Sequence, residues 1–277
     1  MSNTSNIEDV RAFWESTPLW TGESNFSPGT KAFYEEHRST VIQDCFAGTL
    51  DVRTIPAPAQ RRQVLDLGCG PGFWLIELSR LGCEELMGAD LTEAALKLAK
   101  QRCEIMGAQV NLSRENAEEL SFPNERFTHV NCQGVIHHSP NAEKCVSEIA
   151  RVLQKNGTAS ISVYYKNFFL NFWPVLKWPA KLLAFAGAKL KGRGRDKIYS
   201  LESVEEIVRM YDGAENPIGK AYSTQEFHKM VEPYFEIEET YLHFFPARSL
   251  PFKIPRFLHA YLDQHFGFMI YLSLRKK

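Results

Sequence analysis

Short apolar runs alternate with amphipathic stretches through the middle of the chain. The runs have the length and the bounding turn residues of buried strands, and they lie at 64–67, 85–90, 109–113, 127–133 and 158–165. The stretches between them repeat apolar residues at helical spacing, and the clearest lie at 73–80, 93–106 and 141–153. Strands that alternate with helices in this way predict an α/β fold built on a parallel sheet.

The first predicted strand leads into a turn that holds three glycines at alternate positions. Gly68, Gly70 and Gly72 can adopt backbone angles that other residues avoid, and they present no Cβ atom to a ligand. The helix that follows directs its first N–H groups toward the same place. Asp66 stands at the carboxyl end of the strand, where open α/β sheets bind ligands, and Cys69 lies inside the turn. This stretch therefore predicts a binding site for a nucleotide-like molecule.

The spacing of the glycines excludes two common nucleotide-binding motifs. A dinucleotide fingerprint, G-x-G-x-x-G, requires glycine where Phe73 or Leu75 stands. A phosphate loop requires Gly-Lys followed by Ser or Thr, a sequence that occurs nowhere in the chain. The pattern that remains, D-x-G-x-G-x-G from Asp66 to Gly72, resembles the cofactor loop of class I S-adenosylmethionine methyltransferases.

A second acidic residue ends the next predicted strand. Asp90 follows Gly72 by 18 residues, close to the roughly 20-residue spacing at which a strand–helix–strand unit brings a carboxylate to ribose hydroxyls. A carboxylate suits this task because it accepts hydrogen bonds from both hydroxyls of a vicinal diol. We therefore expect Asp90, with Leu91 beside it, to contact a ribose, and we expect Thr92 to cap the following helix.

Two further segments resemble the same family. Residues 115–123 are similar to its D-A-x-x-L-P-F segment, which contacts adenine, although Asn116 replaces the usual acid; its amide oxygen can still accept a hydrogen bond. Residues 134–165 match the G-V-x-H-H-x-P…E-I-x-R-V-L-x-x-x-G pattern of methyltransferases related to the quinone-biosynthesis enzymes. The resemblance covers roughly residues 60–165. It implies that the cofactor is contacted by Asn116, Ala117, Glu118 and Gln133.

The resemblance also implies a fold and a cofactor. The fold is a Rossmann-like sheet of seven mostly parallel strands with an antiparallel last strand and helices on both faces. The cofactor is S-adenosylmethionine, and S-adenosylhomocysteine is its product. Predicted strands at 235–244 and 267–274 agree with the antiparallel hairpin of this fold. We expect four parts, which are a helical N-terminal cap over 1–58, a cofactor-binding core over 59–166, a large insert after the fifth strand over 167–223, and the rest of the sheet over 224–277.

Composition and charge restrict the partners. The net charge is −1, whereas proteins that grip nucleic acid usually carry a basic surface, so nucleic acid is an unlikely partner. None of the six cysteines forms a C-x-x-C pair, so we expect no metal site. Because the sequence shows neither a disulfide framework nor a signal-peptide pattern, we expect a cytoplasmic protein.

The insert is where we expect substrate choice to be determined. Residues 168–190 are rich in aromatic and aliphatic side chains, and a basic run follows as far as Lys197. Lysines and two prolines within this stretch argue against a transmembrane helix. Three interpretations stay open for residues 168–197: a lid over a small organic substrate, a surface in peripheral contact with a membrane, or an oligomer contact. The oligomeric state is accordingly left open.

Aromatic side chains around the core supply candidates for an acceptor pocket. In the family that the sequence resembles, the segment before the first core strand often folds over the cofactor. The candidates are Trp14, Trp20, Tyr34, Tyr164, Tyr211 and Tyr222. The alternative is that these aromatic residues belong to the hydrophobic core, as aromatic residues at helical spacing usually do.

These patterns predict an enzyme that methylates oxygen or nitrogen of a small-molecule or lipid-like acceptor. Such an acceptor loses a proton, and His137 and His138, which follow the fourth strand, can take it because imidazole titrates near neutral pH. The alternative role of this pair is to shape the pocket. Two other functions stay open. The basic run 189–197 leaves room for methylation of tRNA or another RNA, and a non-catalytic cofactor-binding subunit could activate a partner.

Overall fold

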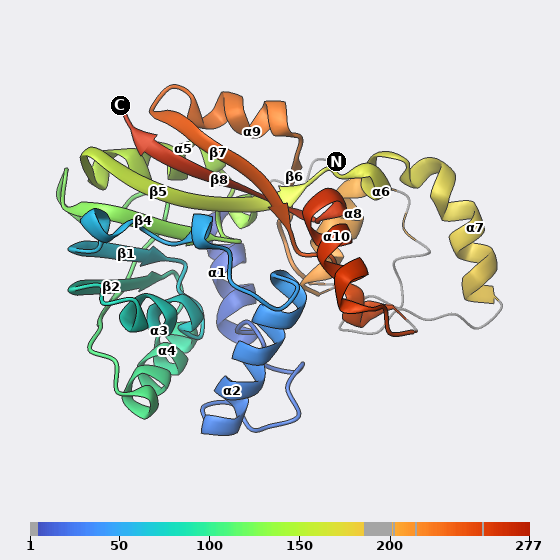
Figure 1. Ribbon diagram of the computed structural model, residues 1–277, viewed down its shortest axis with the longest axis horizontal. Helices are drawn as coiled ribbons and strands as arrows, with labels where there is room; N and C mark the ends of the chain where they lie inside the picture. Colours follow the sequence, from blue (N-terminus) through green and yellow to red (C-terminus); the bar gives the residue numbers. More distant parts are fainter. Residues whose placement is uncertain (1–4, 186–200, 202, 214, 251) are drawn as a thin grey trace.

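The computed structural model describes residues 5–185, 201, 203–213, 215–250 and 252–277. Its centre is one sheet in the order β3-β2-β1-β4-β5-β8-β7, with a short strand, β6, paired to the end of β5. The strands are β1 (Gln63–Leu67), β2 (Glu85–Asp90), β3 (Asn111–Arg114), β4 (Phe127–Gln133), β5 (Leu153–Tyr165), β6 (Ala221–Tyr222), β7 (Phe235–His243) and β8 (Met269–Lys276). Strands β1 to β5 run parallel, and β8 lies antiparallel between β5 and β7 (Figure 1). The predicted Rossmann-like sheet is confirmed.

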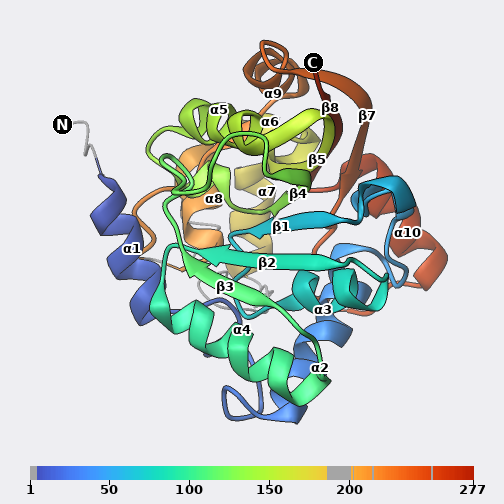
Figure 2. The same cartoon turned by 90° about the vertical axis from the view of Figure 1, so that its left-hand side faces the viewer.

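Helices cover both faces of the sheet (Figures 1 and 2). They include α3 (Phe73–Arg80) and α4 (Glu93–Met106) on one side and α5 (Ala142–Val152) and α9 (Thr224–Val231) on the other. Adjacent residues of β1 point to opposite faces of the sheet, because side chains alternate along a strand. Val64 packs in a buried cluster with the apolar side chains of α3 and α4, whereas Leu65 packs in a second cluster with those of α5 and α9.

A helical cap precedes the sheet. It consists of α1 (Ile7–Ser16), α2 (Lys31–Thr40) and a short π-helix, η1 (Val41–Cys45). Figure 2 shows α1 beside α4, and one side chain joins them: the Glu15 carboxylate accepts the backbone N–H groups of Glu93 and Ala94 at 2.9 and 3.0 Å. These N–H groups belong to the first turn of α4 and have no partner within the helix. Glu15 therefore caps a core helix from outside.

The start of β5 corrects one prediction. The sequence predicts a helix over 141–153 and a strand only from residue 158, but α5 stops at Val152 and β5 already begins at Leu153. The strand starts early because Leu153 is fully buried and pairs with Phe127 of β4. Gly157 lies inside the strand, where a Cβ atom would come within 2.9 Å of the carbonyl oxygen of Gln154. Glycine is needed there for a close approach of two backbone segments rather than for a helix cap.

The insert forms helices that leave the body of the protein and return to it. They are α6 (Phe168–Asn171), α7 (Trp173–Phe185) and α8 (Val204–Tyr211), and a later helix, α10 (Arg256–Phe266), precedes β8. In Figure 1, α7 projects from the body, whereas α8 lies near the sheet and buries Ile207 and Val208. The basic run 189–197 lies outside the described residues. Among the helices that the structure describes, none has the length and apolar character needed to cross a bilayer.

Candidate active site

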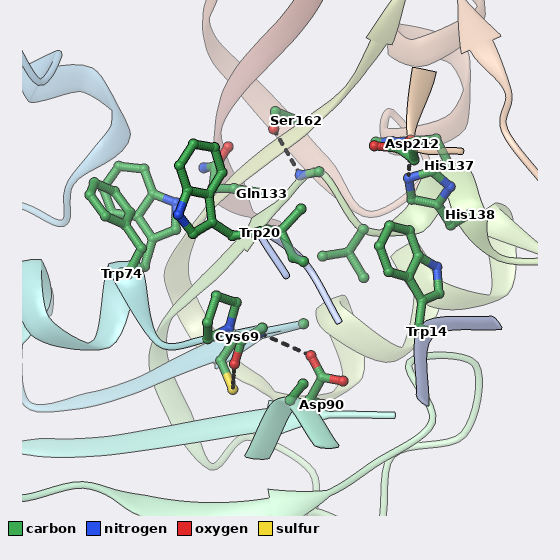
Figure 3. A pocket seen from close by; sticks show the side chains of 18 of the residues that line it. Trp14, Trp20, Cys69, Trp74, Asp90, Gln133, His137, His138, Ser162 and Asp212 are labelled. Carbon is green, nitrogen blue, oxygen red and sulfur yellow. Dashed lines mark hydrogen bonds and ion pairs between the residues drawn. The ribbon is translucent and has the colours of Figure 1, made fainter. Parts of the chain in front are cut away.

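A cavity of about 350 Å³ opens at the carboxyl ends of β1, β2 and β4. Figure 3 shows its arrangement: Cys69 and Asp90 stand on one side, Trp20 and Trp74 on a second, and Trp14 with the histidine pair on a third. The cap thus forms part of the wall, as the sequence predicts. Side chains of α6 and α7 are not among those that line the cavity in the described part of the chain.

The glycine turn forms the edge of the cavity that comes from β1. Gly68 and Gly70 both have positive φ, at 72° and 48°, and both line the cavity. A Cβ atom on Gly68 would lie 2.2 Å from the side chain of Val135, whereas one on Gly70 would meet only Leu19, at 3.9 Å, and would otherwise occupy open space. The absence of a side chain at Gly70 therefore leaves open space in the cavity, and its absence at Gly68 lets the turn pack against Val135.

Gly72 has a different role from the other two glycines. It begins α3 with φ of 76°, and a Cβ atom there would approach Ala99 of α4 at 3.2 Å. Gly72 does not line the cavity. Its place in the motif is explained by the close packing of two helices.

Asp90 lines the cavity beside Leu91 and is held in one orientation by the protein. One carboxylate oxygen accepts the N–H of Gly70 at 2.9 Å, and the other accepts the N–H and hydroxyl of Thr92 at 3.0 and 2.9 Å. Burial raises the pKa of Asp90, and these hydrogen bonds oppose the shift. A carboxylate has about four acceptor sites, and three are used here, so the oxygen that accepts from Gly70 keeps one site for a ligand hydroxyl.

The segment predicted to meet adenine lies partly at the cavity. Asn116 and Ala117 line it, and the Asn116 amide oxygen accepts the N–H of Glu118 at 3.0 Å. Glu118 does not line the cavity, because its carboxylate accepts hydrogen bonds from the hydroxyl of Ser139 and the N–H of Asn141. Glu118 therefore holds the turn after the histidine pair in place.

Gln133 and Trp20 each contribute a buried polar atom to the wall that lacks a partner within the described part of the chain. The amide nitrogen of Gln133 donates to Asn131 and Ser160, but its Oε1 atom accepts nothing. The indole N–H of Trp20, in the cap, likewise donates to nothing. Both residues line the cavity. Because buried polar groups are nearly always paired, one acceptor and one donor in the same wall indicate a ligand that carries both a donor and an acceptor.

Asp66 lies beneath the cavity rather than in its wall. It is 1% exposed, one carboxyl oxygen accepts the amide of Asn131 at 2.7 Å, and the other is buried without a partner among the described residues. Burial raises the pKa of this carboxyl to about 7. The position of Asp66 favours a role in joining β1 to β4 under the glycine turn over direct contact with the cofactor.

The histidine pair sits on a 3₁₀ turn, η4 (Ile136–His138), directly after β4. The Nδ1 atom of His138 lies 2.7 Å from the carbonyl oxygen of Ile218. A carbonyl can only accept, so this ring nitrogen carries a proton. The other nitrogen, Nε2, lies 3.4 Å from a carboxylate oxygen of Asp212, and the hydroxyl of Tyr164 donates to that same oxygen at 2.8 Å.

His137 is in a different electrostatic environment. Its Nδ1 atom is buried without a partner among the described residues, and its ring lies 4.2 Å from the ring of His138 and 4.3 Å from that of Tyr164. Burial, together with the neighbouring His138, holds the pKa of His137 well below 6.5. His137 is therefore neutral near pH 7.

The predicted substrate residues divide into two groups. The cavity wall includes Trp14, Trp20, Tyr164 and Tyr211. Tyr34 is buried elsewhere, with its hydroxyl donating to the carbonyl of Leu98 at 2.7 Å. Tyr222 lies on β6 and packs against the main core, and neither tyrosine lines the cavity. For these two residues the core interpretation of the aromatic pattern is correct.

Much of the aromatic wall was not predicted from the sequence. It comes from Phe46, Trp74, Phe244 and Tyr271. Arg248 also lines the cavity and joins distant parts of the chain, because its guanidinium bonds the carboxylates of Glu23 at 2.7 Å and Asp44 at 3.0 Å. No local motif marks these residues, because they meet only through tertiary packing.

Residues 64–157 match a family model described as a methyltransferase domain. This part of the chain, about a third of its length, is therefore similar to methyltransferase domains. Among curated relatives, it is 29% identical over 146 residues to an uncharacterized methyltransferase, YcgJ, of Bacillus subtilis, covering 52% of this chain and 56% of the relative. It is 32% identical over 107 residues to a ubiquinone biosynthesis O-methyltransferase of Alkalilimnicola ehrlichii, covering 38% of this chain and 43% of the relative. The chain spans about half the length of the curated relatives it matches.

Solved structures share the methyltransferase fold over most of this chain. A S-adenosylmethionine-dependent methyltransferase from Methanosarcina mazei superposes with a TM-score of 0.53 at 18% identity, covering 80% of this chain and 98% of the other. A Thermotoga maritima protein described as a possible histamine N-methyltransferase gives 0.53 at 15% identity, covering 88% and 95%. The likeness in fold therefore extends beyond residues 64–157 to the flanking helices and strands.

The cofactor of this methyltransferase domain is S-adenosylmethionine, and the cavity fits it. Asp90 presents a carboxylate suited to ribose hydroxyls, and Gly70 leaves space where a side chain would intrude. Gln133 and Trp20 offer one unpaired acceptor and one unpaired donor, which match the ammonium and carboxylate of an amino-acid group.

Proposed function

We propose that this protein methylates a hydroxyl group of a small, largely apolar or lipid-like molecule. The observation that carries the proposal is that one cavity contains both Asp90, with the glycine turn, and an aromatic wall that holds His138 and Asp212. The O-methyltransferase relatives support oxygen as the acceptor atom. The aromatic wall supports an apolar acceptor, because such walls bind flat or aliphatic groups and exclude water.

The chemistry requires removal of one proton. The cofactor supplies a methyl group on a positively charged sulfur and leaves as a neutral thioether, so the protein has to align the acceptor and accept its proton. We assign the proton to Nε2 of His138, because Nδ1 is already held as a donor by the carbonyl of Ile218. The carboxylate of Asp212, 3.4 Å away, stabilises the charge that the ring then gains.

His137 is a poor base. Its pKa lies well below 6.5, so it holds a proton poorly near neutral pH. We assign it to the pocket wall, where its ring packs against Tyr164. Acidic side chains outnumber basic ones in the wall, which contains Glu23, Asp44, Asp90, Glu115 and Asp212 against Arg248. This balance disfavours an RNA phosphate backbone as the substrate.

The test is turnover by the purified chain with isotopically labelled S-adenosylmethionine. The acceptors are phenols, long-chain alcohols and amines small enough for the cavity. We expect label on an oxygen, and we expect His138→Gln and Asp212→Asn to lower kcat roughly 100-fold while affinity for S-adenosylhomocysteine stays within about twofold. His228→Gln is the matched control, because this ring hydrogen-bonds the hydroxyl of Thr240 on β7 and does not line the cavity.

Two outcomes contradict the assignment. If His138→Gln keeps the wild-type rate at saturating cofactor and acceptor, His138 is not the base. If the chain alone transfers no label to any acceptor but binds S-adenosylhomocysteine, the non-catalytic subunit becomes the better explanation.

A further inference from the structure

Five apolar side chains form an exposed stripe along α6 and α7. They follow one another at intervals of four, three, three and four residues, which places them on one side of a helical path. Their exposed fractions lie between 50% and 71%, and they are Phe168, Phe172, Val175, Trp178 and Leu182. A contiguous apolar surface of this kind on a folded protein normally marks an interaction site.

The first part of the stripe is anchored to the body of the protein by Leu170 and Trp173. Leu170, on the opposite side of α6, is buried in the cluster that includes Tyr164 and Tyr271 of the cavity wall. The indole N–H of Trp173 donates to the carbonyl of Leu201 at 3.0 Å. Beyond this point α7 extends away from the body, as Figure 1 shows, and the described residues leave the stripe uncovered.

The sequence around the stripe carries charge of a single sign, although Lys166 is paired with Glu226 at 2.9 Å. Between residues 166 and 195 the sequence contains no Asp or Glu, and its charged residues are Lys166, Lys177, Lys181, Lys189, Lys191, Arg193 and Arg195. Residues 189–195 lie outside the described part, and only their charge enters here. Within the described part, the ammonium of Lys181 lies 5.6 Å from the ring centre of Trp178.

We propose that the α6–α7 stripe docks on an anionic lipid bilayer, with the helices lying in the plane of the interface. Aromatic and aliphatic side chains flanked by lysines are the composition of interfacial helices, and clustered cations attract anionic lipids. At 13 residues α7 is too short to span a bilayer. A second copy is a poorer occupant, because two facing stripes would bring their cations together.

The docking does not depend on the reaction proposed above, but it complements it. Because α6 packs on the cluster that contains Tyr164 and Tyr271, a bilayer on the stripe lies next to the aromatic wall of the cavity. An apolar acceptor dissolved in the membrane is then concentrated near the site.

The test is flotation of the purified full chain with vesicles. The probes are vesicles of phosphatidylcholine alone and of phosphatidylcholine mixed with an equal amount of phosphatidylglycerol. We expect binding to the anionic vesicles that weakens as salt rises, and a roughly tenfold or greater loss of binding in a double variant, Trp178→Ser with Leu182→Ser. A single variant, Phe172→Ser, should also weaken binding. Phe26→Ser is its matched control, because the two rings are 48% and 51% exposed and only Phe172 belongs to the stripe.

Three results overturn the proposal. The first is wild-type protein that stays unbound with anionic vesicles. The second is a double variant that floats as well as the wild type. The third is a light-scattering mass that shows the wild type as a dimer and the double variant as a monomer, which identifies a second copy as the occupant. Turnover of a water-soluble acceptor should be the same in wild type and double variant, so a failure of docking is distinguishable from a failure of the proposed function.

Discussion

The carboxylate of Asp90 accepts the backbone N–H of Gly70 at 2.9 Å, which ties the end of β2 to the glycine turn after β1. The acid predicted to contact a ribose therefore also fixes the shape of the turn that lies beside it. A substitution at Asp90 changes both the charge available to the ligand and the support of the turn.

Asp90→Asn tests the charge with little change in shape. One amide oxygen can still accept from Gly70, but the amide nitrogen cannot accept from Thr92 or from a diol. We expect the Kd for S-adenosylhomocysteine to rise at least tenfold, measured by calorimetry, because hydrogen bonds to a charged group contribute about 1.5–3 kcal/mol. Glu93→Gln, an equal change of charge at an exposed position of α4, should leave the Kd unchanged. Equal affinities for Asp90→Asn and wild type would rule out the ribose contact.

Gly70→Ala tests whether the space at the turn belongs to the ligand. The new methyl group meets only Leu19, so the protein should fold, with a cost of about 1–2 kcal/mol for the positive φ of 48°. Gly107→Ala, at the end of α4 with φ of 72° and nothing within 4 Å, carries a similar backbone cost away from the cavity. We expect both variants to melt lower and only Gly70→Ala to lose cofactor affinity. Loss of affinity in both would assign the effect to strain.

Glu15→Ala tests how the cap is attached. Removing the carboxylate leaves the N–H groups of Glu93 and Ala94 without their partner, and we expect a loss of about 1 kcal/mol in the free energy of unfolding. Hydrogen exchange should speed up at those two amides. Glu35→Ala, which removes an exposed carboxylate from α2 instead, should change neither quantity. Unchanged exchange in Glu15→Ala would show that the cap is held by apolar packing alone.

His243 gives the protein a pH-dependent stability. Its ring nitrogens lie 2.6 Å from Asp263 and 3.0 Å from Asp51. Burial disfavours a charged ring, but the two carboxylates outweigh it and the pKa of His243 is raised above 6.5. Because the folded-state pKa is the higher one, the stabilisation is complete below pH 6.5 and is lost as pH rises through the folded-state value.

His243→Asn should remove that dependence. We expect the variant to lose about 3 kcal/mol at the acidic end, because the buried carboxylate of Asp263 then lacks its cation, whereas Asp51 keeps its ion pair with Arg53. The difference from wild type should shrink as pH rises, measured by denaturant unfolding across a pH series. His265→Asn, on the exposed side of α10, is the control and should follow the wild type at every pH. A wild-type stability that rises with pH through this range would contradict the charged state.

Local patterns predicted the frame of the fold well. The bounds of β2, β4 and α4 were predicted to the residue, because each element is bounded by a cap or a turn. Thr92 caps α4 as expected, with its hydroxyl accepting the N–H of Ala95. The predicted start of β5, which is five residues too late, shows the limit: a glycine needed for close backbone approach, such as Gly157, looks the same in sequence as one that follows a helix.

The acceptor side was less predictable because it depends on contacts between distant segments. Asp212 and Ile218 lie within the insert, yet they hold His138, which follows β4. Tyr34 and Tyr164 are alike as sequence signals, but only tertiary packing places Tyr164 in the cavity and Tyr34 against Leu98. A sequence motif indicates which functional groups are present, but tertiary packing determines which of them line the cavity.

The guanidinium of Arg248 bonds Glu23 and Asp44, so the regions before and after residues 64–157 meet at the same cavity. A fragment limited to residues 64–157 would retain Asp90 but lack Arg248 and its two carboxylate partners. Exchanging both flanks between two related proteins, while leaving the middle untouched, should transplant the preference for one acceptor onto the other.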